Sequence, residues 1–106
     1  MSVGNGAAPA GKVKQAGVDG TFQLKRLAVY AYKAGWIMLI DQAGQVSDGN
    51  TPRPGWVIPI SKNEWFLLEL DEPLLFVFGC QVVFSDTDVL VTLPAVDEMS
   101  IDIQGP

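Results

Sequence analysis

The chain of 106 residues contains no histidine and a single cysteine, Cys80. Without histidine there is no Ser-His-Asp or Cys-His triad and no zinc finger, and one cysteine cannot form a disulfide within the chain. Cys80 stands between Gly79 and the apolar run 82–84, and no Lys or Arg occurs after Lys62. Because a nucleophilic thiol needs a base or a positive charge nearby, Cys80 is interpreted as a small buried hydrophobic residue.

Long hydrophobic runs are also missing. The longest, residues 36–40 and 65–68, have the length of strands, whereas a membrane helix needs roughly 20 apolar residues. Residues 1–10 lack the charged start and the apolar stretch of a signal peptide. The sequence therefore predicts no signal peptide and no membrane partner.

Positive charge is absent from the second part of the chain. Residues 63–106 carry nine acidic side chains and no base, whereas residues 1–40 carry five basic side chains and only Asp19. A formal net charge of −5 argues against a nucleic-acid partner, since such proteins need a basic face. Two interpretations of the asymmetry stay open: the basic part of one copy faces the acidic part of another, or one chain pairs or solvates its own charges.

What is present is a dense apolar pattern broken by turn residues. The chain is 48% apolar and only 18% charged, and its 11 glycines and seven prolines favour short strands in one domain. The β-branched and aromatic runs predict strands and no long helix. The expected strands are 21–33, 35–41, 55–60, 64–70, 74–78, 80–85, 88–93 and 98–104.

Three of these segments carry more specific expectations. Residues 36–40 are apolar on both parities, so both faces of that strand should be covered. In strand 21–33 the apolar residues stand at even positions before Lys25-Arg26 and at odd positions after it. This change indicates a β-bulge or, alternatively, two short strands with a bend. Residues 61–64 match a capping box, so a helical turn is the alternative to a strand after Ser61.

The fold class expected from this pattern is all-β, with a single antiparallel β-sandwich of jelly-roll-like topology over residues 21–106. Residues 1–20 are small and Gly/Ala-rich, and they are expected to form an extended N-terminal arm that is flexible or docked on a partner. Residues 41–54, rich in glycine, proline and short polar side chains, are expected to form a long surface loop.

No constellation of residues predicts catalysis, a cofactor or a metal. The paired acids at 71–72, 86–88 and 97–98 lie next to short strands, where carboxylates are usually solvated or bonded to local backbone. Calcium binding by Asp86, Asp88 or the turn at 48–50 is conceivable, but no full ligand loop can be identified. The N-terminal glycines precede no strand–helix unit that would cradle a phosphate.

The tryptophans support two interpretations. Trp36, Trp56 and Trp65 could stack on sugar rings, which would make the protein a carbohydrate-binding module for attachment to a host surface. Alternatively, the large rings build the core of a small sandwich or an oligomer interface.

Several motifs resemble small proteins encoded by tailed bacteriophages and prophages. They are residues 35–41 (GWIMLID), 47–49 (SDG), 51–52 (TP), 56–60 (WVIPI) and 78–87 (FGCQVVFSDT). The resemblance covers about residues 27–93 and departs from the phage pattern at Val46, where a proline is common, and at Cys80-Gln81. It implies a virion-associated, all-β structural protein without catalytic activity.

The expected function is therefore a capsid decoration, head-fibre base or tail-associated subunit, made in the host cytoplasm and located in the virion. Its expected partners are copies of itself, with a trimer favoured, and major capsid or tail proteins. The candidate assembly contacts are Lys12, Lys14, Lys25, Arg26, Trp36 and Trp56.

Overall fold

The computed structural model of the protein describes residues 12–53 and 55–106, and within them the chain forms only strands, turns and bends. No helix in this part of the chain is therefore long and apolar enough to cross a membrane. The strands are β1 (Gln15–Asp19), β2 (Phe22–Ala31), β3 (Gly35–Asp41), β4 (Val57–Ile60), β5 (Glu64–Phe76), β6 (Gly79–Ser85) and β7 (Met99–Gln104).

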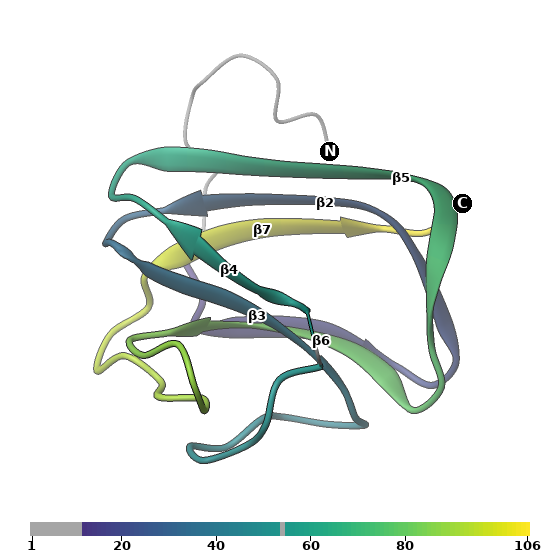
Figure 1. Ribbon diagram of the computed structural model, residues 1–106, viewed down its shortest axis with the longest axis horizontal. Helices are drawn as coiled ribbons and strands as arrows, with labels where there is room; N and C mark the ends of the chain where they lie inside the picture. Colours follow the sequence, from purple (N-terminus) through teal and green to yellow (C-terminus); the bar gives the residue numbers. More distant parts are fainter. Residues whose placement is uncertain (1–11, 54) are drawn as a thin grey trace.

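The strands form two antiparallel sheets that pack face to face (Figure 1). One sheet has the order β1-β6-β3-β4 and the other the order β5-β2-β7. Of the links between consecutive strands, only that from β3 to β4 stays within one sheet, and every other link crosses between the layers. The expectation of an all-β fold made of two antiparallel layers is confirmed.

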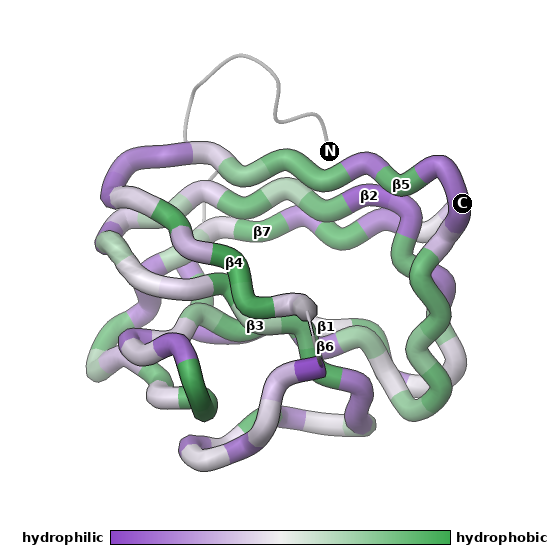
Figure 2. Tube along the Cα trace, in the orientation of Figure 1, coloured by the Kyte–Doolittle hydropathy of each residue, from purple (hydrophilic) through white to green (hydrophobic). Residues whose placement is uncertain are grey.

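The main core lies between the two sheets and follows the alternation of the strands. In β2, Leu27 and Val29 point inward, and in β3 the inward residues are Ile37 and Leu39. The hydropathy of the trace alternates along β7 (Figure 2). The other fully buried members of this core are Leu24, Ala31, Phe76, Cys80, Val82, Phe84 and Met99.

A second, smaller core covers the outer face of the four-stranded sheet. Met38 of β3 and Val83 of β6 pack there against Val46 and Val91, which belong to the loops 42–56 and 86–98. These two loops hold each other, since Gly49 N donates to Val91 O over 2.8 Å and Val91 N donates to Asn50 O over 2.9 Å. Both faces of β3 are therefore covered, as the sequence predicted.

The pairing of β2 with β5 is irregular where the register shifts between Leu24 and Arg26. Residues 70–73 of β5 lie opposite Lys25 alone, and the proline in that segment has no N–H to donate. In a regular strand Leu24 and Leu27 would point to opposite faces. Because of this shift both side chains reach the main core. The bulge expected at the basic pair is confirmed, and β2 remains one strand.

Residues 64–70 are extended, so the strand interpretation is confirmed over the helical turn. The capping-box contact nevertheless forms, because Ser61 N donates to Glu64 Oε1 over 3.2 Å. Asn63 adopts a φ of 58° and donates its N–H to Ala31 O, which turns the chain from one sheet into the other. The two strands expected at 64–70 and 74–78 form a single strand, β5, that ends at Phe76.

The strand expected over residues 88–93 is wrong. Residues 88–90 form bends and residues 91–93 are irregular, because side chains take the backbone bonds that a ladder would need. Ser85 Oγ donates to Thr87 O over 2.7 Å and accepts from Thr92 N over 3.0 Å. Thr87 and Thr92 also join their hydroxyls over 2.8 Å, which closes the loop on itself.

The structure describes only part of the arm that was expected over residues 1–20. Residues 1–11 lie outside the described residues. Residues 15–19 form β1, which pairs along its whole length with β6 of the same chain. Gly17 allows this pairing, because a Cβ there would lie 2.0 Å from Gln81 Oε1 and 2.7 Å from Cys80 O.

Candidate functional site

Eight large apolar side chains of the described residues are exposed, and four of them gather at one end of the sandwich. The link between β5 and β6 consists of Val77 and Phe78, which are 53% and 65% exposed, and Leu75 and Val18 are exposed beside it. Val18 pairs with Cys80, so the end of β1 lies next to the link. We call Val18, Leu75, Val77 and Phe78 the apolar tip (lower right in Figures 1 and 2).

The carboxylate of Asp41, the last residue of β3, organises the backbone of this tip. It accepts hydrogen bonds from three consecutive N–H groups, those of Val77 (2.9 Å), Phe78 (2.8 Å) and Gly79 (3.3 Å). Burial raises the pKa of Asp41, but these three donors, helped by the charge of Arg53, outweigh it and hold the pKa below its usual range. Asp41 is therefore an ionised structural clamp.

The remaining polar groups of the link are also bonded within the chain. Gly20 N donates to Phe78 O over 2.8 Å, and Gln42 N donates to Gly79 O over 3.1 Å. Gly79 has to be glycine, because a Cβ there would lie 2.5 Å from Gln42 O. The tip is therefore a fixed structure whose side chains, and not its backbone, are directed to solvent.

Two cations bond backbone carbonyl groups of β5, and one of them, Arg53, does so at the tip. Arg53 donates from Nη1 to Leu75 O over 2.6 Å, and its guanidinium lies 4.9 Å from the centroid of the Phe76 ring. Lys25 Nζ donates to Asp71 O over 2.8 Å in the irregular segment of β5. Both contacts fix β5 where it bends toward the other sheet.

The six residues expected to make assembly contacts lie on different surfaces. Lys12 sits over the ring of Tyr32 at 4.2 Å, and Lys14 lines a recess described below. Lys25 bonds Asp71 O in the irregular segment of β5, and Arg26 pairs with Glu69 over 3.7 Å on the outer face of the three-stranded sheet. The structure does not bring these cations together.

The three tryptophans do not form one platform either. Trp56 packs against the main core. Trp36 alternates with the inward residues Ile37 and Leu39 and so faces outward from the four-stranded sheet. Trp65 faces outward from the other sheet, where its ring meets that of Tyr30 edge to face at 5.0 Å. Its Nε1 is buried and has no hydrogen-bond partner within the described residues.

Two of the acidic candidates, Asp86 and Asp48, are bonded to other residues of the chain. Asp86 pairs with Lys33 over 2.8 Å, and that hydrogen bond, opposed by partial burial, raises the pKa of Lys33. Asp48 Oδ1 accepts from Leu93 N over 2.8 Å, which joins the two outer loops. In the part of the chain that the structure describes, no group of three or more Cys, Asp or Glu side chains could hold a metal ion.

Cys80 is fully buried in the main core, as expected. Burial, with a contribution from Asp41, raises the pKa of its thiol to about 12. We therefore predict that a thiol reagent at pH 8 labels Cys80 only when the protein unfolds, since the thiolate fraction there is about one in ten thousand. Labelling should reach completion in denaturant, and rapid labelling of the native protein would contradict this placement.

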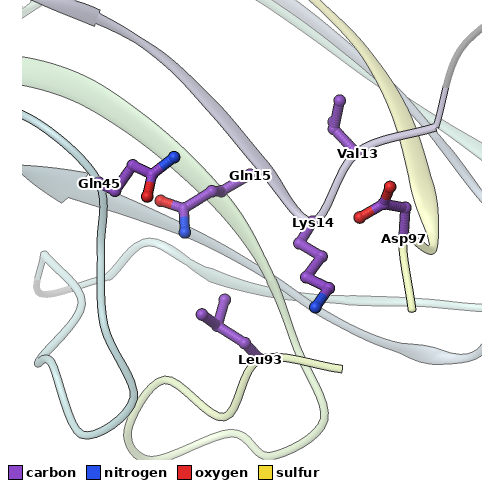
Figure 3. A pocket seen from close by; sticks show the side chains of 6 residues that line it. All are labelled: Val13, Lys14, Gln15, Gln45, Leu93 and Asp97. Carbon is purple, nitrogen blue, oxygen red and sulfur yellow. The ribbon is translucent and has the colours of Figure 1, made fainter. Parts of the chain in front are cut away.

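A recess of about 450 Å³ lies at the opposite end of β1 from the tip. Its walls combine two apolar and four polar side chains, namely Val13, Lys14, Gln15, Gln45, Leu93 and Asp97 (Figure 3). The Gln15 amide bonds both backbone groups of Val46, at 2.9 and 2.7 Å, and so fixes the loop that forms one wall.

Sequence reasoning missed the tip and its clamp. The pattern placed Val77 and Phe78 inside a strand, and nothing in the neighbourhood of Asp41 shows that its partners lie 36–38 positions later in the chain. The only local signal is an acid that ends an apolar strand. No family model, no curated protein and no solved structure matches this chain.

Proposed function

We propose that the chain is a non-catalytic structural subunit of a bacteriophage virion: a capsid decoration, a head-fibre base or a tail-associated protein. It acts by self-association, with a trimer favoured, and by docking on major capsid or tail proteins. The resemblance of residues 27–93 to small phage proteins supports this proposal. On that view the sandwich has a jelly-roll-like topology, and the N-terminal residues reach a neighbouring subunit.

The structural observation that carries the proposal is the rigid apolar tip. Single exposed apolar residues are ordinary on protein surfaces, but a contiguous group marks an interaction site. Here the backbone of the group is held by a charged clamp and by hydrogen bonds within the chain. A fixed apolar surface of this kind suits a subunit that binds another protein.

The carbohydrate-binding alternative requires tryptophan rings on a common exposed surface. Trp36 and Trp65 lie on the outer faces of different sheets and Trp56 is packed on the core, so one sugar chain would meet at most one of them. The assembly function therefore fits the arrangement of the side chains better.

We predict that the protein is oligomeric and that deletion of residues 1–11 weakens its incorporation into particles. The deletion stops before β1, because removal of residues 1–20 would also take away a strand that pairs with β6. Sedimentation velocity should give a mass near three times the 11.4 kDa chain. Particle-bound protein is measured by quantitative blotting after gradient purification.

The shortened protein should keep the circular dichroism spectrum of the full chain, which serves as the folding control. A monomer at all concentrations, together with undiminished incorporation of the shortened protein, would defeat the proposed function.

A further inference from the structure

Two side chains of opposite charge, Lys14 and Asp97, line the recess at the start of β1 (Figure 3). Lys14 is half-buried and Asp97 is exposed. Among the described residues neither side chain has a hydrogen bond or an ion pair, and the two do not pair with each other. The recess therefore holds one cation and one anion whose binding capacity the fold does not use.

The walls of the recess are held in place by hydrogen bonds within the chain. Val13 N donates to Met99 O over 2.7 Å, and Met99 N donates to Val13 O over 3.2 Å. The side-chain amide of Gln15 fixes one outer loop, and the bond from Leu93 N to Asp48 fixes the other. Because the backbone around the recess is already ordered, a ligand would not lose free energy by ordering it.

The two charges of the lining restrict the class of ligand. A simple anion that pairs with Lys14 would be repelled by Asp97, and a simple cation that pairs with Asp97 would be repelled by Lys14. A neutral ligand would cover both charges and leave them unpaired, which costs free energy. A small zwitterion, in contrast, supplies one charged partner for each side chain.

The other lining residues indicate what the zwitterion carries between or beside its charges. Val13 and Leu93 offer apolar contact, and the exposed amide of Gln45 can donate and accept hydrogen bonds. The volume of about 450 Å³ lies within the range of small-molecule sites, roughly 300–1,000 Å³. A free amino acid with an aliphatic side chain fits this combination of charge, size and apolar contact.

We propose that the recess binds a zwitterionic α-amino acid with an aliphatic side chain. The ammonium group of Lys14 pairs with the ligand's carboxylate, and the carboxylate of Asp97 pairs with its α-ammonium group. Val13 and Leu93 contact the aliphatic side chain. The recess and the apolar tip lie at opposite ends of β1, so this site does not depend on the tip or on the self-association of the proposed function.

The test titrates free leucine into the isotope-labelled full chain and follows the backbone amides by heteronuclear NMR. N-acetylleucine lacks the ammonium group and leucinamide lacks the carboxylate, so each should bind about fivefold more weakly than leucine or worse. Saturable shifts on addition of leucine should be confined to the residues around the recess, namely Val13, Lys14, Gln15, Gln45, Leu93, Asp97 and their neighbours in the chain.

Variants test the two charges of the protein with matched controls. Lys14→Gln and Asp97→Asn each remove one charge of the lining, and each should weaken leucine binding about fivefold or more. Lys62→Gln and Asp88→Asn remove an exposed ammonium group and an exposed carboxylate that do not line the recess, and both should bind leucine like the wild-type protein. The NMR spectrum without leucine shows whether each variant is folded.

Three results would overturn the inference. If leucine causes no saturable shift around the recess, the recess is not an amino-acid site. If N-acetylleucine or leucinamide binds as tightly as leucine, the two charges do not select the ligand, and this comparison needs no variant to fold. If Lys14→Gln and Asp97→Asn bind normally, or the controls weaken binding equally, leucine binds elsewhere. None of these results bears on the proposed function, because its self-association is measured without a ligand.

Discussion

Replacing Phe84 by alanine is expected to lower the free energy of unfolding by about 4 kcal/mol, as large-to-small changes in a packed core do. Phe84 is fully buried in β6, and its ring fills the space beside the backbone of Gly35, where a Cβ would come within 2.5 Å of Cζ. Removing the ring leaves a cavity between the two sheets, and neither sheet can move alone to fill it. Urea unfolding followed by circular dichroism gives the value.

The matched control is the same replacement at Phe78. Because this ring is mostly in water, Phe78→Ala should change the free energy of unfolding by less than about 0.5 kcal/mol. A loss similar to that of Phe84→Ala would mean that Phe78 belongs to the core, and the apolar tip would then have no free anchor.

Replacing Asp41 by alanine is expected to cost about 3 kcal/mol, because three N–H groups lose a charged acceptor and water can replace it only in part. Asp48→Ala is the control, since Asp48 accepts a single N–H from the outer loop and should cost only about 1 kcal/mol. Equal losses for the two variants would show that Asp41 has no special role at the tip.

The ionisation of Asp41 allows a second test of its role, which is the dependence of stability on pH. Its pKa is lower in the folded than in the unfolded protein, so its contribution is complete above the unfolded pKa of about 3.9 and is lost as the pH falls through the folded value. The stability difference between wild type and Asp41→Asn should therefore shrink as the pH is lowered below about 4. A difference that stays constant would contradict the ionised clamp.

Much of the fold follows from local patterns in the sequence. The apolar residues of both parities in β3 predicted a strand covered on both faces, and the outer loops supply that cover. The change of parity at Lys25 predicted the irregular pairing of β2. These predictions succeed because the alternation of side chains in a strand is fixed by its backbone geometry.

The failures have a different physical origin. Residues 88–93 contain β-branched side chains, but the hydroxyls of Ser85 and Thr87 bind the backbone there and replace a ladder. The sequence also does not show which apolar residues stay exposed. Its apolar pattern therefore predicts a strand that runs through Phe78, although this side chain is directed to solvent. Asp41 and its partners are far apart in the chain, and no spacing rule relates them.

The position of β6 has a consequence for biosynthesis. This strand is buried along its whole length, with β1 and β3 on its two edges and a core on each face. β1 and β3 therefore cannot complete their sheet until β6 has emerged from the ribosome. The nascent polypeptide should stay sensitive to protease until β7 has emerged as well, because β7 pairs with β2 and completes the other sheet.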